Sequence, residues 1–78
     1  EAGDLYSYAL KVDRDSLFAG SPIKDSRIRE DYDCIILGLQ RSKLPIAQPD
    51  INMTIQPGDL IWILGTKTMA GKLLQEDL

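Results

Sequence analysis

The side chain best suited to recognise a ligand in this sequence is an arginine beside an apolar anchor. Arg29 directly follows Ile28, so an aliphatic side chain can enter the core while the neighbouring guanidinium projects outward. A guanidinium is a planar fork of donors that matches phosphate or carboxylate groups. The alternative is a surface ion pair with an acidic neighbour. These neighbours are Glu30, Asp31 and Asp33.

The residue types needed for most catalysis and for zinc binding are missing. The chain has no histidine and one cysteine, Cys34, which excludes an internal disulfide and removes the commonest general base and metal ligand. The glycines form no dinucleotide-binding or phosphate-loop fingerprint, and no nucleophile stands beside a base. We therefore expect no enzymatic activity. Cys34 opens an apolar run and is expected to be buried and inert.

Acidic side chains are the remaining candidates for cation binding. They form small groups that lack the spacing of an EF-hand, and calcium requires six to eight oxygens around one point. A solvated acidic surface is the stronger interpretation, and a divalent cation site is the weaker one. The groups are Asp13 with Asp15, Glu30 and Asp31 with Asp33, and the turn residues Asp50 and Asp59.

Length and composition indicate one small globular domain. The 78 residues are 44% hydrophobic and 27% charged with a net charge of −3, near the lower size limit for a single core without disulfides or metals. The longest apolar runs, residues 34–39 and 60–64, are far shorter than the roughly 20 residues of a membrane-spanning helix. The nine basic residues are dispersed, which predicts no nucleic-acid partner. Because the chain starts at Glu1, we expect residues 1–78 to be a domain excised from a larger protein.

Hydrophobic periodicity predicts four strands. Apolar residues alternate over residues 6–12, which is typical of a half-buried strand. The runs at 34–41 and 60–65 predict strands that are apolar on both faces. Residues 45–49 have a proline at each end, which predicts a short strand at a sheet edge.

Two helices are expected beside these strands. Ser21 and Pro22 suit the start of a short helix over residues 22–30, and a capped helix is expected from Thr66 onward. The predicted order is therefore strand, short helix, three strands and a final helix. This order is typical of an α+β domain.

Two strands that are apolar on both faces are more than so small a domain can cover. We expect one face to meet another copy of the chain or another domain, with self-association favoured, because exposed apolar area marks an interface. In the alternative, the final helix and the connector over residues 50–56 cover the second face. Trp62 lies within one of these strands and is expected to pack in the core or in a dimer contact.

Several short motifs occur in a fixed order along the chain. They are residues 17–22 (LFAGSP), 27–33 (RIREDYD), 34–41 (CIILGLQR), the isolated Pro49 and 56–65 (QPGDLIWILG). Their order and spacing resemble the C-terminal domain of the RCK type, the TrkA-C domain, over a core of about residues 5–74. This resemblance implies a small mixed β-sheet, partly closed, with a covering helix, and pairing as a homodimer.

The resemblance also implies a function. Domains of this family regulate potassium channels, potassium uptake systems and cation/proton antiporters from the cytoplasmic face of the membrane. The expected partners are a second copy, the membrane-spanning part of the same transport protein and a small regulatory ligand. The ligand would change the relative orientation of the two copies and so gate or modulate ion transport. The alternative is a purely structural dimerisation domain that senses no ligand.

The candidate ligand contacts also come from this resemblance. In family members that bind cyclic di-AMP at the dimer cleft, an arginine at the position of Arg29 contacts phosphate. Pro49 matches a proline that packs on adenine, although it also suits the end of an edge strand. Ile23 and Ile28 resemble the aliphatic lining, and Ile35 replaces a polar residue of those nucleotide binders. Cyclic di-AMP or another nucleotide is the expected ligand, with no resident metal.

Overall fold

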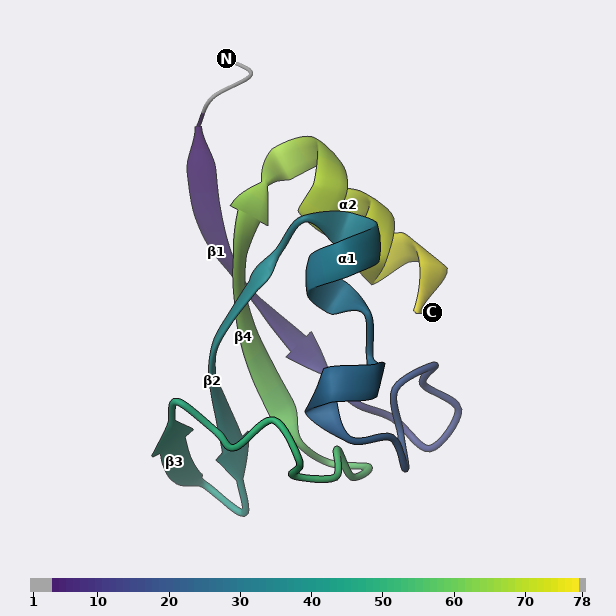
Figure 1. Ribbon diagram of the computed structural model, residues 1–78, viewed down its shortest axis with the longest axis vertical. Helices are drawn as coiled ribbons and strands as arrows, with labels where there is room; N and C mark the ends of the chain where they lie inside the picture. The colour runs from purple at the N-terminus through teal and green to yellow at the C-terminus, as the bar shows by residue number, and fades with distance from the viewer. Residues whose placement is uncertain (1–3, 78) are drawn as a thin grey trace.

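The fold is built around a strand that pairs on both of its edges. The computed structural model describes residues 4–77 and contains one four-stranded sheet with the order β1-β4-β2-β3 (Figure 1). The strands are β1 (Leu5–Lys11), β2 (Ile35–Arg41), β3 (Leu44–Ala47) and β4 (Leu60–Thr66). The helices are α1 (Ile28–Tyr32) and α2 (Lys67–Glu76), and a single 3-10 turn, η1, covers Ile23–Asp25.

The α+β class and the predicted order of elements are confirmed, and each predicted strand lies within two residues of its observed bounds. The sheet, however, is neither mixed nor partly closed, because all three strand pairs are antiparallel and the sheet remains open. β1 and β2 do run in the same direction, as a strand–helix–strand connection favours. β4 lies between them and is antiparallel to both, so no parallel pair forms.

The short helix predicted over residues 22–30 is broken into η1 and α1. Ser26 lies between them, and its hydroxyl donates to the Ile23 carbonyl at 2.7 Å and accepts from the Ile28 N–H at 3.4 Å. A serine side chain that occupies backbone groups in this way competes with helix continuation. Arg27 then takes a left-handed conformation with φ 59°. The predicted start of the last helix is confirmed, since Thr66 accepts from the Met69 N–H at 3.3 Å.

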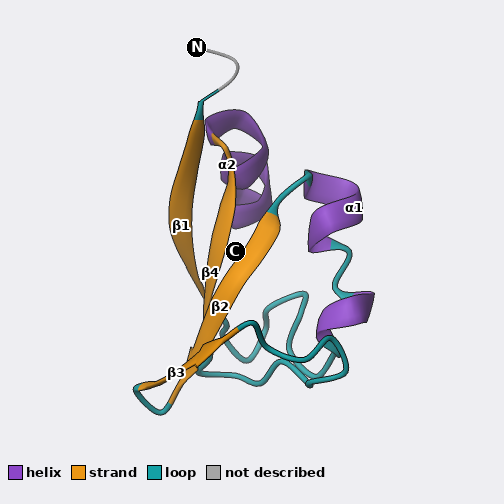
Figure 2. Ribbon diagram, turned by 60° about the vertical axis from the view of Figure 1, so that its left-hand side comes forward, coloured by secondary structure: helices purple, strands orange, loops and turns teal. Residues whose placement is uncertain are grey.

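The hydrophobic core lies on one side of the sheet. α2 packs against β4, β1 and α1, and both helices lie on the same face of the sheet (Figure 2). The largest fully buried side chains there come from β2, β4, α1, α2 and the connectors: Leu39, Ile61, Ile63, Ile28, Leu73, Ile55 and Val12. Cys34 is also buried, as expected.

The opposite side of the sheet, which we call the outer face, carries no helix from the described residues 4–77. The register places on it Leu5, Ala9, Ile35, Trp62 and Leu64, and Leu37 joins them at a bulge in β2. The alternative in which the final helix and the connector cover this second face is therefore wrong. Trp62 is 39% exposed, so it does not lie in the core of the chain.

A partly buried ion pair fixes the turn that leads into β4. Asp59 is 1% exposed, and its two oxygens accept from the Arg41 Nε and Nη2 at 2.9 and 2.8 Å. The Gln56 N–H also donates to Asp59 at 2.8 Å, and Arg41 donates to the Thr54 carbonyl at 2.9 Å. Burial alone raises the pKa of Asp59, but the hydrogen bonds from Arg41 and Gln56 and the charge of Arg41 outweigh it and lower the pKa.

We predict that Asp59→Asn lowers the free energy of unfolding by about 1–3 kcal/mol at neutral pH, because Arg41 then loses its charged partner. Asp31→Asn is the matched control. Asp31 pairs with Arg27 at 3.0 Å on the surface, and an exposed pair contributes about 0–1 kcal/mol. Urea unfolding of both variants and of the native chain measures the difference.

The same ion pair predicts a pH dependence. The contribution of Asp59 to the free energy of unfolding is fully present above the pKa of Asp59 in the unfolded chain, about 4. This contribution is lost as the pH falls through the lower pKa of Asp59 in the folded protein. The stability difference between the native chain and Asp59→Asn should therefore shrink in acid. A difference that stays constant down to the acid-unfolding limit would contradict this role for the carboxylate.

Candidate ligand-binding site

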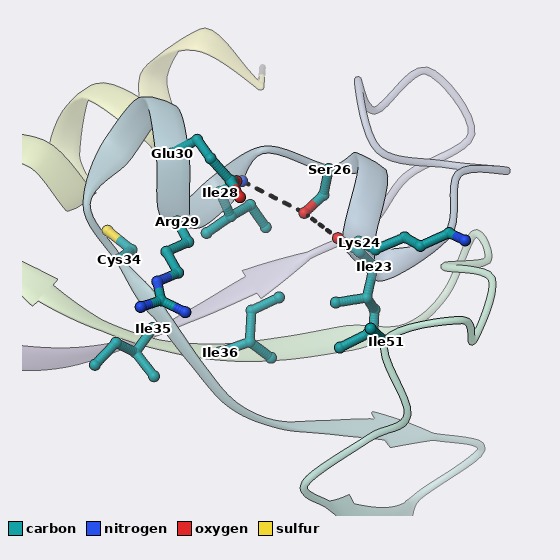
Figure 3. A pocket seen from close by; sticks show the side chains of 10 residues that line it. All are labelled: Ile23, Lys24, Ser26, Ile28, Arg29, Glu30, Cys34, Ile35, Ile36 and Ile51. Atoms are coloured by element: carbon teal, nitrogen blue, oxygen red, sulfur yellow. Dashed lines mark hydrogen bonds between the residues drawn. The ribbon is translucent and has the colours of Figure 1, made fainter.

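A hollow of about 550 Å³ opens between η1, α1 and the start of β2 (Figure 3). Aliphatic side chains dominate its wall, and its five isoleucines come from four separate segments of the sequence. The lining residues are Ile23, Lys24, Ser26, Ile28, Arg29, Glu30, Cys34, Ile35, Ile36 and Ile51.

The structure brings together four of the five residues expected at the site. Ile23, Ile28, Arg29 and Ile35 all line the cavity, whereas the half-buried Pro49 does not. Ile51, which is 61% exposed, lines the wall formed by the connector.

Long-range backbone hydrogen bonds place Ile51 beside the helical segment. The Lys24 N–H donates to the Ile51 carbonyl, and the Ile23 N–H donates to the Met53 carbonyl, each at 2.9 Å. These bonds join segments almost thirty residues apart. The alternation of Ile51, Met53 and Ile55 is visible in the sequence, but nothing local indicates which of these side chains reaches the cavity.

Arg29 is the cationic group that the cavity offers to a ligand. Within residues 4–77 its guanidinium makes no hydrogen bond or ion pair with another side chain. In Figure 3 its side chain extends from α1 toward the start of β2, whereas the Lys24 side chain points away from the isoleucines. The surface pair considered as an alternative for Arg29 is therefore not formed.

The local geometry of α1 explains why Arg29 lacks an acidic partner. Asp31 is already held by Arg27, one turn earlier, through three hydrogen bonds of 3.0–3.2 Å. Asp33 stands four residues after Arg29, the spacing of a helical ion pair. The backbone of Asp33 is left-handed, with φ 52°. The chain therefore leaves the helical path at Asp33, and the Asp33 side chain is not at the position that a continued helix would give it.

Two of the other polar groups of the wall, Ser26 and Cys34, are occupied by the fold, whereas the charged side chains of Lys24 and Glu30 make no hydrogen bond or ion pair within residues 4–77. The Ser26 hydroxyl bonds the backbone at both ends of its turn, and the Cys34 thiol donates to the Tyr32 carbonyl at 3.3 Å. Burial, and next the nearby charge of Asp33, raise the pKa of Cys34, so the thiol is not activated. The cavity therefore offers a guanidinium beside an isoleucine surface, an arrangement that suits a ligand with a phosphate and a flat apolar group.

Hydrogen bonds from the end of α2 join it to α1 and to the loop after β1. The Tyr32 hydroxyl, at the end of α1, donates to the Glu76 carboxylate. Asp77 accepts from the Ser16 hydroxyl at 2.7 Å and from the Leu17 N–H at 2.9 Å. The hydrogen bond to Glu76, together with burial, raises the pKa of Tyr32 to about 12. The short helix that carries Arg29 is thus fixed to α2 at its C-terminal end.

Among residues 4–77, no three acidic, cysteine or histidine side chains converge on one point where a metal ion could bind. None of the helices in that stretch is both long and apolar enough to cross a membrane.

The sequence matches the family of TrkA-C domains over residues 8–76. No curated protein matches the chain. Among solved structures, the RCK C domain of the potassium transport protein KtrA, in complex with cyclic di-AMP, has a TM-score of 0.85 and 25% identity. The match covers 96% of this chain and 86% of that one.

Two further relatives share the fold at lower identity. The RCK_C domain dimer of S. agalactiae BusR with cyclic di-AMP has a TM-score of 0.76 and 19% identity, and the match covers 90% of this chain and 96% of that chain. The GsuK channel bound to NAD has a TM-score of 0.78 and 16% identity, with 91% of this chain and 13% of the channel covered.

The expectation of no nucleic-acid partner is overturned by BusR. A structure of BusR in complex with busA-promoter DNA matches with a TM-score of 0.79 and 20% identity, over 96% of this chain and 38% of that chain. The expectation rested on the dispersed basic residues of these 78 positions. The charges of one domain say nothing about the partners of the protein that contains it.

We predict that Tyr32→Phe lowers the free energy of unfolding by about 1 kcal/mol, because Glu76 then loses a buried hydrogen-bond donor. In a Glu76→Ala background, Tyr32→Phe should lower the free energy of unfolding much less, because the hydrogen bond is already absent. Tyr6→Phe is the control, since the Tyr6 hydroxyl makes an exposed contact of 3.4 Å. Equal costs for Tyr32→Phe in both backgrounds would show that the hydrogen bond does not hold α1 to α2.

Proposed function

We propose that this chain, which belongs to the TrkA-C domain family, is a regulatory domain that binds a nucleotide in the cavity between η1, α1 and β2. In this proposal it works as a homodimer, at the cytoplasmic face of the membrane, within a channel, uptake system or antiporter for potassium or another cation. The domain performs no catalytic step. It changes transport by responding to the ligand.

The observation that carries the proposal is the state of Arg29. The preceding and following arginines of the sequence, Arg27 and Arg41, are paired with carboxylates. Arg29 instead lines an isoleucine-rich cavity and has no partner among the described residues. A guanidinium without a partner beside an apolar surface loses nothing within the fold when it binds an anion. A charge-assisted hydrogen bond then forms without breaking another one.

Cyclic di-AMP is the first candidate for the ligand. The RCK C domains of KtrA and BusR are in complex with it, which supports a nucleotide of this kind, and the GsuK channel is bound to NAD. Ile35 and Ile36 offer no hydrogen bond to a base edge. We propose that recognition depends on the phosphate at Arg29 and on apolar contact of the base with isoleucine, so selectivity among bases is low.

A regulatory effect requires that the ligand bind one arrangement of the domain better than another. α1 carries Arg29 and Ile28, has only five residues and is bounded by left-handed residues at both ends. A ligand on Arg29 therefore acts on a short element that can respond as a unit. Its link to α2 through Tyr32 and Glu76 provides a contact through which a shift of α1 reaches another element.

Two other roles compete with this proposal. BusR in complex with promoter DNA favours a parent protein that regulates transcription, in which the domain would still sense a ligand. A structural dimerisation domain would sense no ligand. The rest of the reading frame distinguishes the first from a transporter, since a transporter requires apolar segments of about 20 residues. Ligand binding distinguishes the second.

We predict that Arg29→Ala weakens cyclic di-AMP binding about 10- to 100-fold, as expected for loss of a charge-assisted hydrogen bond of about 1.5–3 kcal/mol. Arg14→Ala is the matched control, because Arg14 is an exposed arginine that does not line the cavity, whereas Arg27→Ala would release Asp31. Isothermal titration calorimetry with cyclic di-AMP, NAD and divalent cations measures binding. Equal affinities for Arg29→Ala and the native chain, or no binding of any ligand, would refute the site.

We also predict that Ile51→Ala weakens nucleotide binding several-fold, whereas Pro49→Ala leaves it unchanged. Ile51 lines the cavity and Pro49 does not, and truncating the exposed Ile51 side chain should not affect folding. The same calorimetry tests both variants. A larger loss of affinity for Pro49→Ala than for Ile51→Ala would show instead that Pro49 packs on the base.

A further inference from the structure

Among residues 4–77, one carboxylate lines the ligand cavity. It belongs to Glu30, which directly follows Arg29, and both side chains are exposed. Consecutive residues of a helix do not face each other, and these two form no ion pair. In Figure 3 Arg29 extends from α1 toward the start of β2, whereas Glu30 leaves α1 on the side of Ser26. The wall therefore presents a positive and a negative group that are not paired with each other.

The other basic side chains near the cavity do not neutralise Glu30. Lys24 also lines the wall, but its side chain points away from the isoleucines in Figure 3. Arg27 is paired with Asp31 at 3.0 Å and does not line the cavity. A ligand held at Arg29 is therefore exposed to the negative charge of Glu30 on the same wall.

We infer that Glu30 makes the cavity select against nucleotides with a terminal phosphate. This inference rests on the proposed function and defines the class of nucleotide that the same site accepts. An internal phosphate, linked on two sides, carries one negative charge, whereas a terminal phosphate carries about 1.5–2 at neutral pH. Arg29 alone neutralises the first. Glu30 repels the additional charge of the second, and such a contact between like charges is a means of rejecting a competing ligand.

The accepted class is that of cyclic dinucleotides and of dinucleotides joined through internal phosphates. Cyclic di-AMP and NAD both belong to it, whereas free nucleoside monophosphates and triphosphates do not. The side chains of Ile35 and Ile36 in the wall offer no hydrogen bond to a base edge. Charge is therefore the property by which this wall distinguishes ligands that share a base.

Calorimetric titration with two matched ligands tests the inference. Cyclic di-AMP and its linear form pApA have the same bases, but pApA ends in a terminal phosphate. Glu30→Gln removes the charge of the side chain and keeps its length. We expect this substitution to raise the affinity for pApA about three- to sevenfold more than the affinity for cyclic di-AMP. One further charge about 7 Å away, at an effective dielectric constant of about 40–80, has an effect of this size.

Asp25→Asn is the matched control. Asp25 is an exposed carboxylate of η1 that does not line the cavity, so its substitution changes the net charge by the same amount on the preceding segment. We expect Asp25→Asn to leave the ratio of the two affinities unchanged.

Salt provides a second measurement on the same proteins. The Debye length falls from about 30 Å at 0.01 M to about 3 Å at 1 M ionic strength. The effect of Glu30→Gln on the ratio of the two affinities should therefore fade over this range, since Glu30 is exposed. An effect that is independent of salt would show a change of shape and not of charge, and would overturn the inference.

The remaining outcomes separate this inference from the proposed site. Equal gains for both ligands in Glu30→Gln, or the same change of the ratio in Asp25→Asn, would overturn the role of Glu30. A loss of cyclic di-AMP affinity in Glu30→Gln would also overturn it, because the carboxylate would then accept a hydrogen bond from the ligand. In each of these cases the site at Arg29 stands. If neither ligand binds the native chain, the site and the role of Glu30 are both wrong.

Discussion

The helical layer of this domain covers one face of its sheet and leaves the other face bare. β4 carries apolar side chains on both faces, yet α1, α2 and η1 all pack on one side. That side becomes the core, with Ile61 and Ile63 at its centre. The outer face keeps Trp62 at the surface. Because a chain of this size can bury only a modest share of its area, this asymmetry decides where the core, the cavity and the apolar surface lie.

The candidate site lies where the helical layer is least regular. Ser26 ends η1, Arg27 starts α1 in a left-handed conformation, and Asp33 ends it in another. Such conformations are uncommon for residues other than glycine and cluster at functional sites. Here they separate Arg29 from the carboxylates that follow it, while Arg27 occupies Asp31. Within residues 4–77, an Arg29 guanidinium without a partner beside an isoleucine-lined cavity is thus a consequence of local backbone geometry.

The fold was largely predictable from the sequence, and the details of pairing were not. Alternation and apolar runs located the strands because side-chain burial repeats every second residue. The sheet is antiparallel because β4 lies between β1 and β2. This is a long-range pairing that no local sequence pattern predicts. Likewise the GD turn before β4 was visible in the sequence, but Arg41, the ion-pair partner of the buried Asp59, stands 18 residues earlier and is placed there by tertiary packing.

The sequence by itself determined the α+β class, the lack of histidine and of a disulfide, and an arginine beside an apolar anchor, because these depend on residue type and local spacing. Only the tertiary structure decided that Arg29 has no partner among residues 4–77, since that depends on the backbone path at Asp33 and on the pairing of Asp31 with Arg27. The tertiary structure also places Ile51 at the cavity, where Pro49 was expected. The connector reaches η1 through backbone hydrogen bonds to distant residues, and side-chain type alone contains no information about such pairing.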